Sequence, residues 1–113
     1  MARAMAGPDA KDCGRVPAGG DATTVDSCVS MTFTGHQAFY ARYDLQGFDS
    51  KVAKLIVGDA SGRVYFLMWD SDPSGGGDAH ETIDRWECLS PMVDGTMTPL
   101  GCADASAMAR VCS

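Results

Sequence analysis

Apolar residues recur at spacings of three and four positions between residues 21 and 39, which is the pattern of a helix with one apolar face. Asp21 or Thr23 is placed to cap the start of this helix, and Asp26 falls in its first turn. Gly35 lowers helix stability by about 1 kcal/mol relative to alanine, so we expect a weak last turn. The positions on the shared face are Val25, Cys28, Val29, Phe33, His36 and Phe39. We therefore expect one helix over residues 21–39 that packs on another layer.

Strand patterns follow this helix. Residues 41–46 alternate between apolar and polar side chains, as in a strand with one solvent-exposed face. Residues 51–57 and 63–69 are separated by five residues that include two glycines, which suits a hairpin with a bulge. Residues 82–93 and 97–102 flank an Asp-Gly turn, which is another hairpin signal.

The two ends of the chain have weaker patterns. Prolines and glycines mark residues 1–20 as an irregular arm, and the alanine-rich residues 103–113 fit a docked tail or one short helical turn. Residues 21–113 are expected to form a single α+β domain. In it, one N-terminal helix packs on a four- to five-stranded antiparallel sheet, in an arrangement that resembles a cystatin-like wrap and is stabilised by disulfides.

The strand expected at residues 63–69 is apolar on both faces. It alternates two sets of side chains, with Val64, Phe66 and Met68 on one face and Tyr65, Leu67 and Trp69 on the other. The helix can cover one face, so the other needs a second cover, because a bare apolar patch promotes association. The second cover can be a loop, the chain's own tail with Trp86, a second subunit or protein partner, or a ligand. We assign Tyr65, Leu67, Trp69 and Trp86 to a candidate binding surface.

Composition narrows the range of partners. The chain has 113 residues, a net charge of −6 and a pI near 4.6. A protein that binds a phosphate backbone needs a basic footprint, which this composition lacks. The longest unbroken apolar run covers only residues 64–69, far below the roughly 20 residues of a membrane span. We therefore expect neither a nucleic-acid partner nor a membrane span.

The chain has five cysteines, Cys13, Cys28, Cys88, Cys102 and Cys112. None lies in a CxxC motif, so zinc ribbons and thioredoxin-type redox sites are not indicated and disulfides are favoured. Cys88 and Cys102 lie almost equidistant from the Asp-Gly turn, which favours a bridge between them. Cys13 pairs with Cys28 in one arrangement, and Cys112 takes either of these partners in another.

Disulfides indicate an oxidising compartment, so we expect the protein to be secreted or periplasmic. The alternative is a cytosolic protein in which the cysteines are reduced and buried as small apolar residues. Residues 1–11 lack the apolar core of a secretory signal. Either a leader was removed before residue 1, or the inference of export is wrong.

Residues 70–81, DSDPSGGGDAHE, match much of a twelve-residue calcium loop and resemble that of an EF-hand. In such a loop, oxygen atoms at alternate positions converge on one centre, and a glycine permits the sharp turn. The candidate ligands are Asp70, Asp72, Ser74, Gly76 through its carbonyl, Asp78 and Glu81. Pro73 and the strand pattern before the loop depart from the EF-hand. Calcium is thus a possible cofactor in a different structural setting, and a solvated acidic loop is the alternative.

The sequence contains no known catalytic signature. Its two histidines, His36 and His80, show no spacing that predicts a zinc site. A GxSxG elbow and a phosphate-binding glycine loop are both missing. We therefore expect a non-enzymatic binding or assembly module outside the cytoplasm. The alternatives are a calcium-binding domain and a small hydrolase of unknown type.

One stretch of the chain is similar to other sequences. It runs from Cys28 through AFYARYDLQGFDS (residues 38–50) to VYFLMWDSDPSGGG (residues 64–77) and covers about half of the chain. This stretch resembles a group of small exported bacterial proteins that carry no assigned function. The resemblance implies export and a single helix-plus-sheet domain, and it transfers no catalytic residue.

Overall fold

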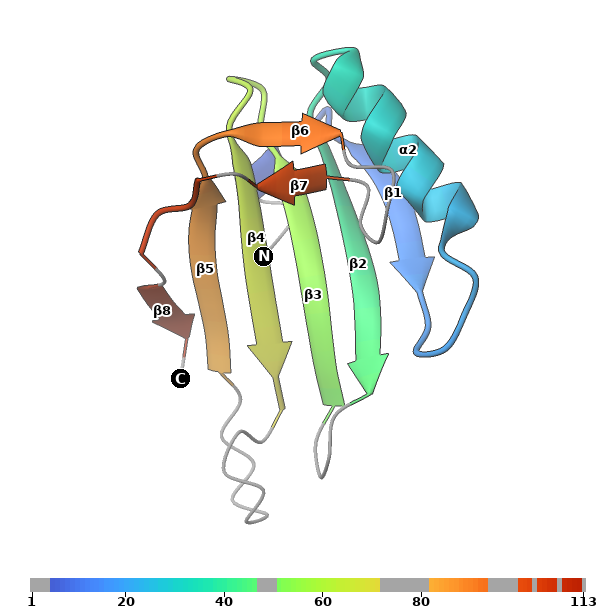
Figure 1. The fold of residues 1–113 in the computed structure, drawn as a ribbon, viewed down its shortest axis with the longest axis vertical. Helices are drawn as coiled ribbons and strands as arrows, with labels where there is room; N and C mark the ends of the chain where they lie inside the picture. Colours follow the sequence, from blue (N-terminus) through green and yellow to red (C-terminus); the bar gives the residue numbers. More distant parts are fainter. Residues whose placement is uncertain are drawn as a thin grey trace.

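The fold is α+β, with one helix packed on a sheet (Figure 1). The computed structural model describes residues 5–46, 51–71, 82–93, 100–102, 104–107 and 109–112. Its elements are β1 (Lys11–Val16), α2 (Thr23–Thr34), β2 (Phe39–Gln46), β3 (Lys51–Gly58), β4 (Val64–Asp70), β5 (Thr82–Cys88), β6 (Pro91–Val93), β7 (Leu100–Cys102) and β8 (Ala109–Cys112). The helix-on-sheet class that the sequence predicts is confirmed.

A mixed sheet forms the centre of the fold. Six strands lie in the order β1-β2-β3-β4-β5-β8, and β6 pairs with β7 in a separate ladder. β1 runs parallel to β2, while the other neighbours run antiparallel. The expected purely antiparallel sheet is therefore corrected to a mixed one, since α2 provides the long crossover that a parallel pair requires. The cystatin-like wrap stays a prediction.

β1 runs through the arm, residues 1–20, that we expected to be irregular. Gly14 has a φ of +104°, and the register between β1 and β2 shifts between Asp12 and Arg15. This bulge breaks the alternation by which a strand is recognised. At the other end of the chain, β8 adds an edge strand where we expected a docked tail or a helical turn.

Helix α2 is shorter than the helix expected over residues 21–39. Beyond its last turn, the Gln37 N–H donates to the Thr32 carbonyl at 2.9 Å, and His36 has a φ of +57°. The His36 N–H donates to the carbonyl of Phe33 at 3.1 Å. This pair of hydrogen bonds is that of a Schellman motif, which ends the helix and reverses the chain. The reversal lets the next residues begin β2 instead of another helical turn.

Two aspartates organise the turns around these elements. The Asp21 carboxylate accepts hydrogen bonds from the N–H and the hydroxyl of Thr23, at 2.9 and 2.6 Å, and these bonds lower the pKa of Asp21. The Asp59 carboxylate accepts from the N–H groups of Ser61 and Arg63, both at 3.0 Å. The second set closes the turn between β3 and β4, so the hairpin expected there is confirmed.

The face of the sheet that α2 covers, here called the front face, carries the larger core. α2 packs mainly on β1 and β2, and the β6–β7 ladder crosses the same side of the sheet (Figure 1). Val29 of the helix, Ile56 of β3 and Leu100 of β7 lie in one buried cluster. The helix and the β6–β7 ladder therefore cover this face together, whereas the sequence pattern predicts that the helix alone covers it.

The favoured Cys88–Cys102 bridge is present, and of the arrangements left open for the other cysteines the structure has Cys13–Cys28. Cys13–Cys28 joins β1 to α2, and Cys88–Cys102 joins β5 to β7, with Cα atoms 5.5 and 5.6 Å apart. The strand expected over residues 82–93 divides into β5 and β6, so Cys102 pairs with Pro91 and not with Cys88. The bridge therefore links the two sheets. The Asp-Gly turn lies outside the described residues.

The opposite face of the sheet, here called the back face, is covered in part by residues 5–10. Ala6 is 2% exposed and packs with Val57 and Leu67, which are 0% and 1% exposed. The alternative in which the tail and Trp86 cover this face is therefore wrong. Trp86 lies on the front face, where its ring stacks on Phe66 with centroids 5.8 Å apart. The N-terminal cover was missed because small apolar residues there show no period.

Candidate functional site

Strand pairing places aromatic and cationic side chains next to one another on the back face. Three rows cross strands β2 to β5, and they consist of Tyr40, Val57, Tyr65 and Glu87, then Arg42, Leu55, Leu67 and Arg85, then Asp44, Ala53, Trp69 and Ile83. Residues two apart on a strand share a face, so the rows lie side by side. Residues of the first row and Leu67 of the second row meet the cover formed by residues 5–10, and Ile83 of the third row packs against the same cluster.

Two arginines hold the rings of Trp69 and Tyr65 on this face. The Arg42 guanidinium carbon lies 5.4 Å from the centre of the Trp69 ring, and that of Arg85 lies 5.8 Å from the centre of the Tyr65 ring. Such cation–π contacts stabilise exposed side chains by about 0.5–1 kcal/mol each. We call these four residues the Arg–Trp surface. All four residues are at least partly exposed, so the surface is accessible to solvent. The arginines hold its two rings in place.

Asp44 orients the arginines at one side of the Arg–Trp surface. Its carboxylate accepts a hydrogen bond from Nε of Arg42 at 2.8 Å and another from Nε of Arg15 on β1. Burial opposes ionisation of Asp44, but the two arginines outweigh it and lower the pKa of the carboxyl. The Asp44 side chain is 12% exposed, whereas those of Arg15 and Arg42 are 63% and 38% exposed. The cations therefore face solvent, and the anion lies beneath them.

The structure brings together only part of the binding surface that the sequence predicts. Tyr65, Leu67 and Trp69 share the back face, but Leu67 lies beneath residues 5–10 and forms a floor. Trp86 lies on the front face, apart from the other three. Three of the four predicted residues therefore lie on the back face, and two of them, Tyr65 and Trp69, are accessible to solvent.

Sequence reasoning missed the charged half of this surface. The sequence pattern places Arg42 and Asp44 on the solvent-exposed face of a strand, and it places Arg15 in an irregular arm. The alternation of residues 41–46 shows that Arg42 and Asp44 share a face, and this was the available signal. Their position next to Trp69 depends on the pairing of β2, β3 and β4, which alternation in one strand does not determine.

The predicted calcium loop falls almost entirely outside the described residues. Asp70 ends β4, where it pairs with Val52 and Thr82. Its expected co-ligands are Asp72, Ser74, Gly76, Asp78 and Glu81, and the structure describes none of them. Within the part of the chain that is described, no cluster of three His, Cys, Asp or Glu residues is placed to hold a metal ion. The calcium site stays a prediction.

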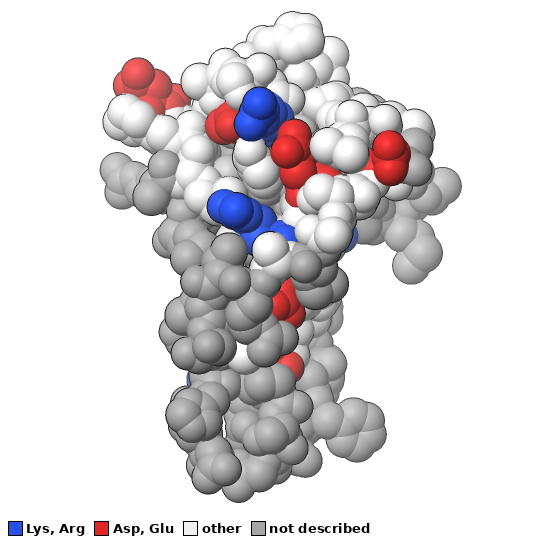
Figure 2. Space-filling view, turned by 90° about the vertical axis from the view of Figure 1, so that its left-hand side faces the viewer, with Lys and Arg blue, Asp and Glu red and all other residues white. Residues whose placement is uncertain are grey.

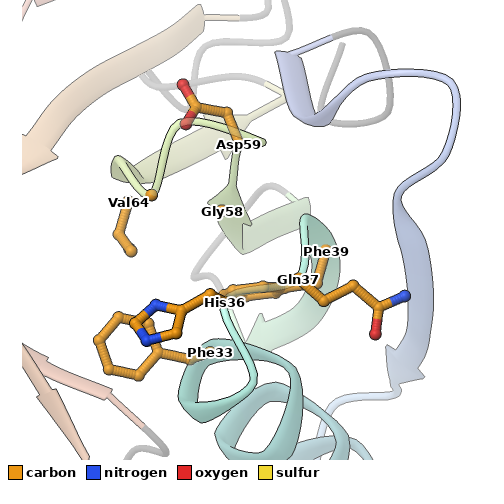
Figure 3. A pocket seen from close by; sticks show the side chains of 8 residues that line it. Phe33, His36, Gln37, Phe39, Gly58, Asp59 and Val64 are labelled. Carbon is orange, nitrogen blue, oxygen red and sulfur yellow. The ribbon is translucent and has the colours of Figure 1, made fainter.

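A small pocket lies where the C-terminal end of α2 meets the β3–β4 turn (Figure 3). Phe33 and His36 point into it beside Val64, whereas the Asp59 carboxylate points away. The histidine and the carboxylate therefore do not form a catalytic pair. With a volume of about 30 Å³, the pocket has room for little more than one water molecule. We interpret it as a packing defect at the helix end.

A wider groove runs between α2 and the start of β1. Its volume is about 560 Å³, and it is lined by Lys11, Thr24, Ser27, Cys28, Met31, Thr32 and Gln37. Met31 is 74% exposed, and the Thr32 hydroxyl already donates to the Cys28 carbonyl at 2.7 Å. Among these lining residues Lys11 is the one cationic side chain, and none carries a carboxylate.

Two polar contacts lie on the front face. The Tyr43 hydroxyl donates to the Asp26 carboxylate at 2.7 Å, and burial together with that carboxylate raises the pKa of Tyr43. The ammonium of Lys54 lies 4.9 Å from the centre of the Phe66 ring, and burial lowers the pKa of Lys54. The Tyr43–Asp26 hydrogen bond joins β2 to the first turn of α2, and the Lys54–Phe66 contact joins β3 to β4. We interpret both contacts as structural.

Charges of both signs are mixed on the side of the molecule near β5 and β8. Figure 2 shows Lys and Arg interspersed with Asp and Glu in its upper half, where described residues are coloured. Among the described helical residues, none forms a segment with the length and hydropathy of a bilayer span. Among the described residues of this side, the charges do not gather into a large single-sign patch.

Comparisons with known protein families, with curated proteins and with solved structures found no match to this chain. Any function must therefore be argued from the geometry above. The resemblance to small exported bacterial proteins stays a prediction.

Proposed function

We propose that the protein is a small, non-enzymatic binding module that works outside the cytoplasm and recognises a protein partner through the Arg–Trp surface. The observation that carries this proposal is the pair of cation–π contacts, Arg42 on Trp69 and Arg85 on Tyr65, on one sheet face. Trp, Tyr and Arg are the residues that most often dominate the energy of protein interfaces.

The support beneath this surface favours binding by preorganised side chains. Tyr65 and Trp69 belong to β4, which is paired on both sides by β3 and β5. The guanidinium of Arg42 donates from Nε to Asp44 and also lies over the Trp69 ring. Side chains that are ordered before binding lose less conformational entropy when the partner docks.

The two disulfides support an oxidising compartment. Small exported domains commonly use such bridges, because their cores are small. Secretion itself is part of the proposal, and it agrees with the resemblance of residues 28–77 to small exported proteins.

The experiment compares capture of a partner by three immobilised proteins from the extracytoplasmic fraction of the source cells. These are the unaltered protein, Trp69→Ala, and the control Met31→Ala, which removes an exposed apolar side chain from α2. A partner of the Arg–Trp surface binds the unaltered protein and Met31→Ala alike. Trp69→Ala should weaken it by about 30-fold, the effect of a hot-spot residue.

A partner that binds Trp69→Ala as tightly as the unaltered protein would contradict the proposal. Sedimentation velocity of the same three proteins tests whether the partner is a second copy. In that case the unaltered protein and Met31→Ala form dimers, and Trp69→Ala remains monomeric at the same concentration.

A further inference from the structure

Residues 5–10 form a strap across the back face, and apolar contacts hold it there. Ala6 is almost fully buried, and Met5 and Ala10 pack against the same cluster as Val57 and Leu67. Within the described strap, the Ala10 N–H donates to the Gly7 carbonyl at 3.3 Å, a bond internal to the strap. For the described residues, backbone bonding to the rest of the sheet begins at Lys11, whose N–H donates to Ala38 at 2.9 Å.

The cross-links fasten the fold just behind the strap and leave the strap itself untethered. Cys13 in β1 is bonded to Cys28 in α2, so separation of the strap from the sheet stops at that point. Gly7 has a φ of +104°, and a Cβ built there would meet no atom within 4 Å. A glycine in this left-handed conformation gives the strap a point where the backbone can change direction without a steric clash from a side chain.

The surface beneath the strap continues the Arg–Trp surface. Leu67 lies under the strap and shares a row with Arg42 and Arg85. Tyr65 contacts the strap cluster and also carries Arg85 over its ring. An opened strap would thus add the apolar floor of Val57 and Leu67 to the accessible Arg–Trp surface without rearranging the sheet.

We propose that the strap opens locally in the folded protein and acts as an autoinhibitory cover of the back face. Among the described residues, apolar contacts of Met5, Ala6 and Ala10 hold the strap, and residues 5–10 contain no cysteine that could cross-link it. Segments held in this way open at a lower free energy than the whole fold. The autoinhibitory role rests on the proposed binding function, whereas the local opening does not.

Thiol labelling tests the opening in the absence of any partner. Val57→Cys and Ile56→Cys are matched variants, because both positions are 0% exposed, are adjacent in β3 and face opposite sides of the sheet. Both are made in a Cys112→Ser background, which removes the cysteine outside the two bridges. Opening of the strap predicts that a maleimide labels Val57→Cys at least about tenfold faster than Ile56→Cys. Rates that agree within about twofold would overturn the proposal, since global unfolding exposes both sites equally.

A second substitution tests whether the strap controls this exposure. Ala6→Glu places a charge in the buried contact and should accelerate labelling of Val57→Cys while leaving Ile56→Cys unchanged. Ala60→Glu, at an exposed alanine in the β3–β4 turn, should change neither rate. Equal acceleration at both cysteines by Ala6→Glu would show that the strap is part of the global fold and would contradict the proposal.

These outcomes are independent of the partner experiment. A failed search for a partner removes the proposed function and leaves a fast Val57→Cys rate in place. A slow Val57→Cys rate removes the strap mechanism and leaves capture through Trp69 untouched.

Discussion

Removal of the Cys13–Cys28 bridge should lower the free energy of unfolding by about 3 kcal/mol. The two cysteines are separated by 15 residues in the sequence. Closing a loop of this length removes conformational entropy from the unfolded chain equivalent to about 3 kcal/mol at 25 °C. The variant is Cys13→Ala/Cys28→Ala, because alanine leaves no polar hydroxyl at Cys13, which is 8% exposed.

The second bridge should contribute almost the same amount. Cys88 and Cys102 are separated by 14 residues, which again corresponds to about 3 kcal/mol. Loss of both bridges would remove about 6 kcal/mol, which is comparable to the total stability of about 5–15 kcal/mol of a typical domain. The reduced protein should therefore be marginally stable, and this connects the fold to an oxidising compartment.

The assay is urea unfolding followed by circular dichroism, with thermal unfolding in parallel. A loss of 3 kcal/mol should lower Tm by roughly 10–20 °C in a domain of this size. The control is Cys112→Ala, which keeps both bridges and should retain the stability of the unaltered protein. A loss below about 1 kcal/mol in Cys13→Ala/Cys28→Ala would refute the loop-entropy argument.

Three further results are expected. Gly58→Ala should lower the free energy of unfolding by about 1–3 kcal/mol, because the new Cβ would lie 2.8 Å from Cδ1 of the buried Phe39 ring. Chemical denaturation measures this loss. An unchanged midpoint would show that the Phe39 ring moves to accommodate the new methyl group. Asp44→Asn should lower Tm at pH 7 by the equivalent of about 1 kcal/mol, since the partner arginines are solvent-exposed. Because the folded pKa of Asp44 is lowered, its contribution is present above the unfolded pKa of about 3.9 and is lost as pH falls through the folded pKa. The stabilities of Asp44→Asn and the unaltered protein should therefore converge as the pH falls through that range; a gap that does not narrow would exclude ionisation as the cause. The calcium hypothesis predicts that millimolar Ca²⁺ raises Tm by mass action and that Asp70→Ala abolishes the rise; equal melts with and without calcium would reject it.

Local signals predicted much of the sheet. The alternation in β2 and the two glycines of the β3–β4 turn act over a few neighbouring residues, so they could be recognised in the sequence. The Cys88–Cys102 pair was also predicted from local spacing, although its two strands belong to different sheets. The disulfide was still predicted correctly, because the chain reverses direction between the two cysteines.

Contacts between distant segments explain what was missed. β1 pairs with β2 across the whole of α2, and its bulge at Gly14 hides the strand period. The burial of Ala6 depends on the back face that it meets, because alanine carries no strong preference of its own. For the candidate site, the sequence placed Tyr65 and Trp69 on one face, while the arrangement of Arg42 over Trp69 required the register of three strands.

Hydroxyl-radical footprinting of a captured complex tests the central claim most directly. Oxidation rates of exposed side chains are measured by mass spectrometry in the free protein and in the complex. The account predicts that Tyr65 and Trp69 become protected, while Met31 on α2 and Leu89 after β5, which are 74% and 53% exposed, keep their rates. Protection of Met31 with unchanged oxidation of Trp69 would place the partner on the other side of the molecule and contradict the account.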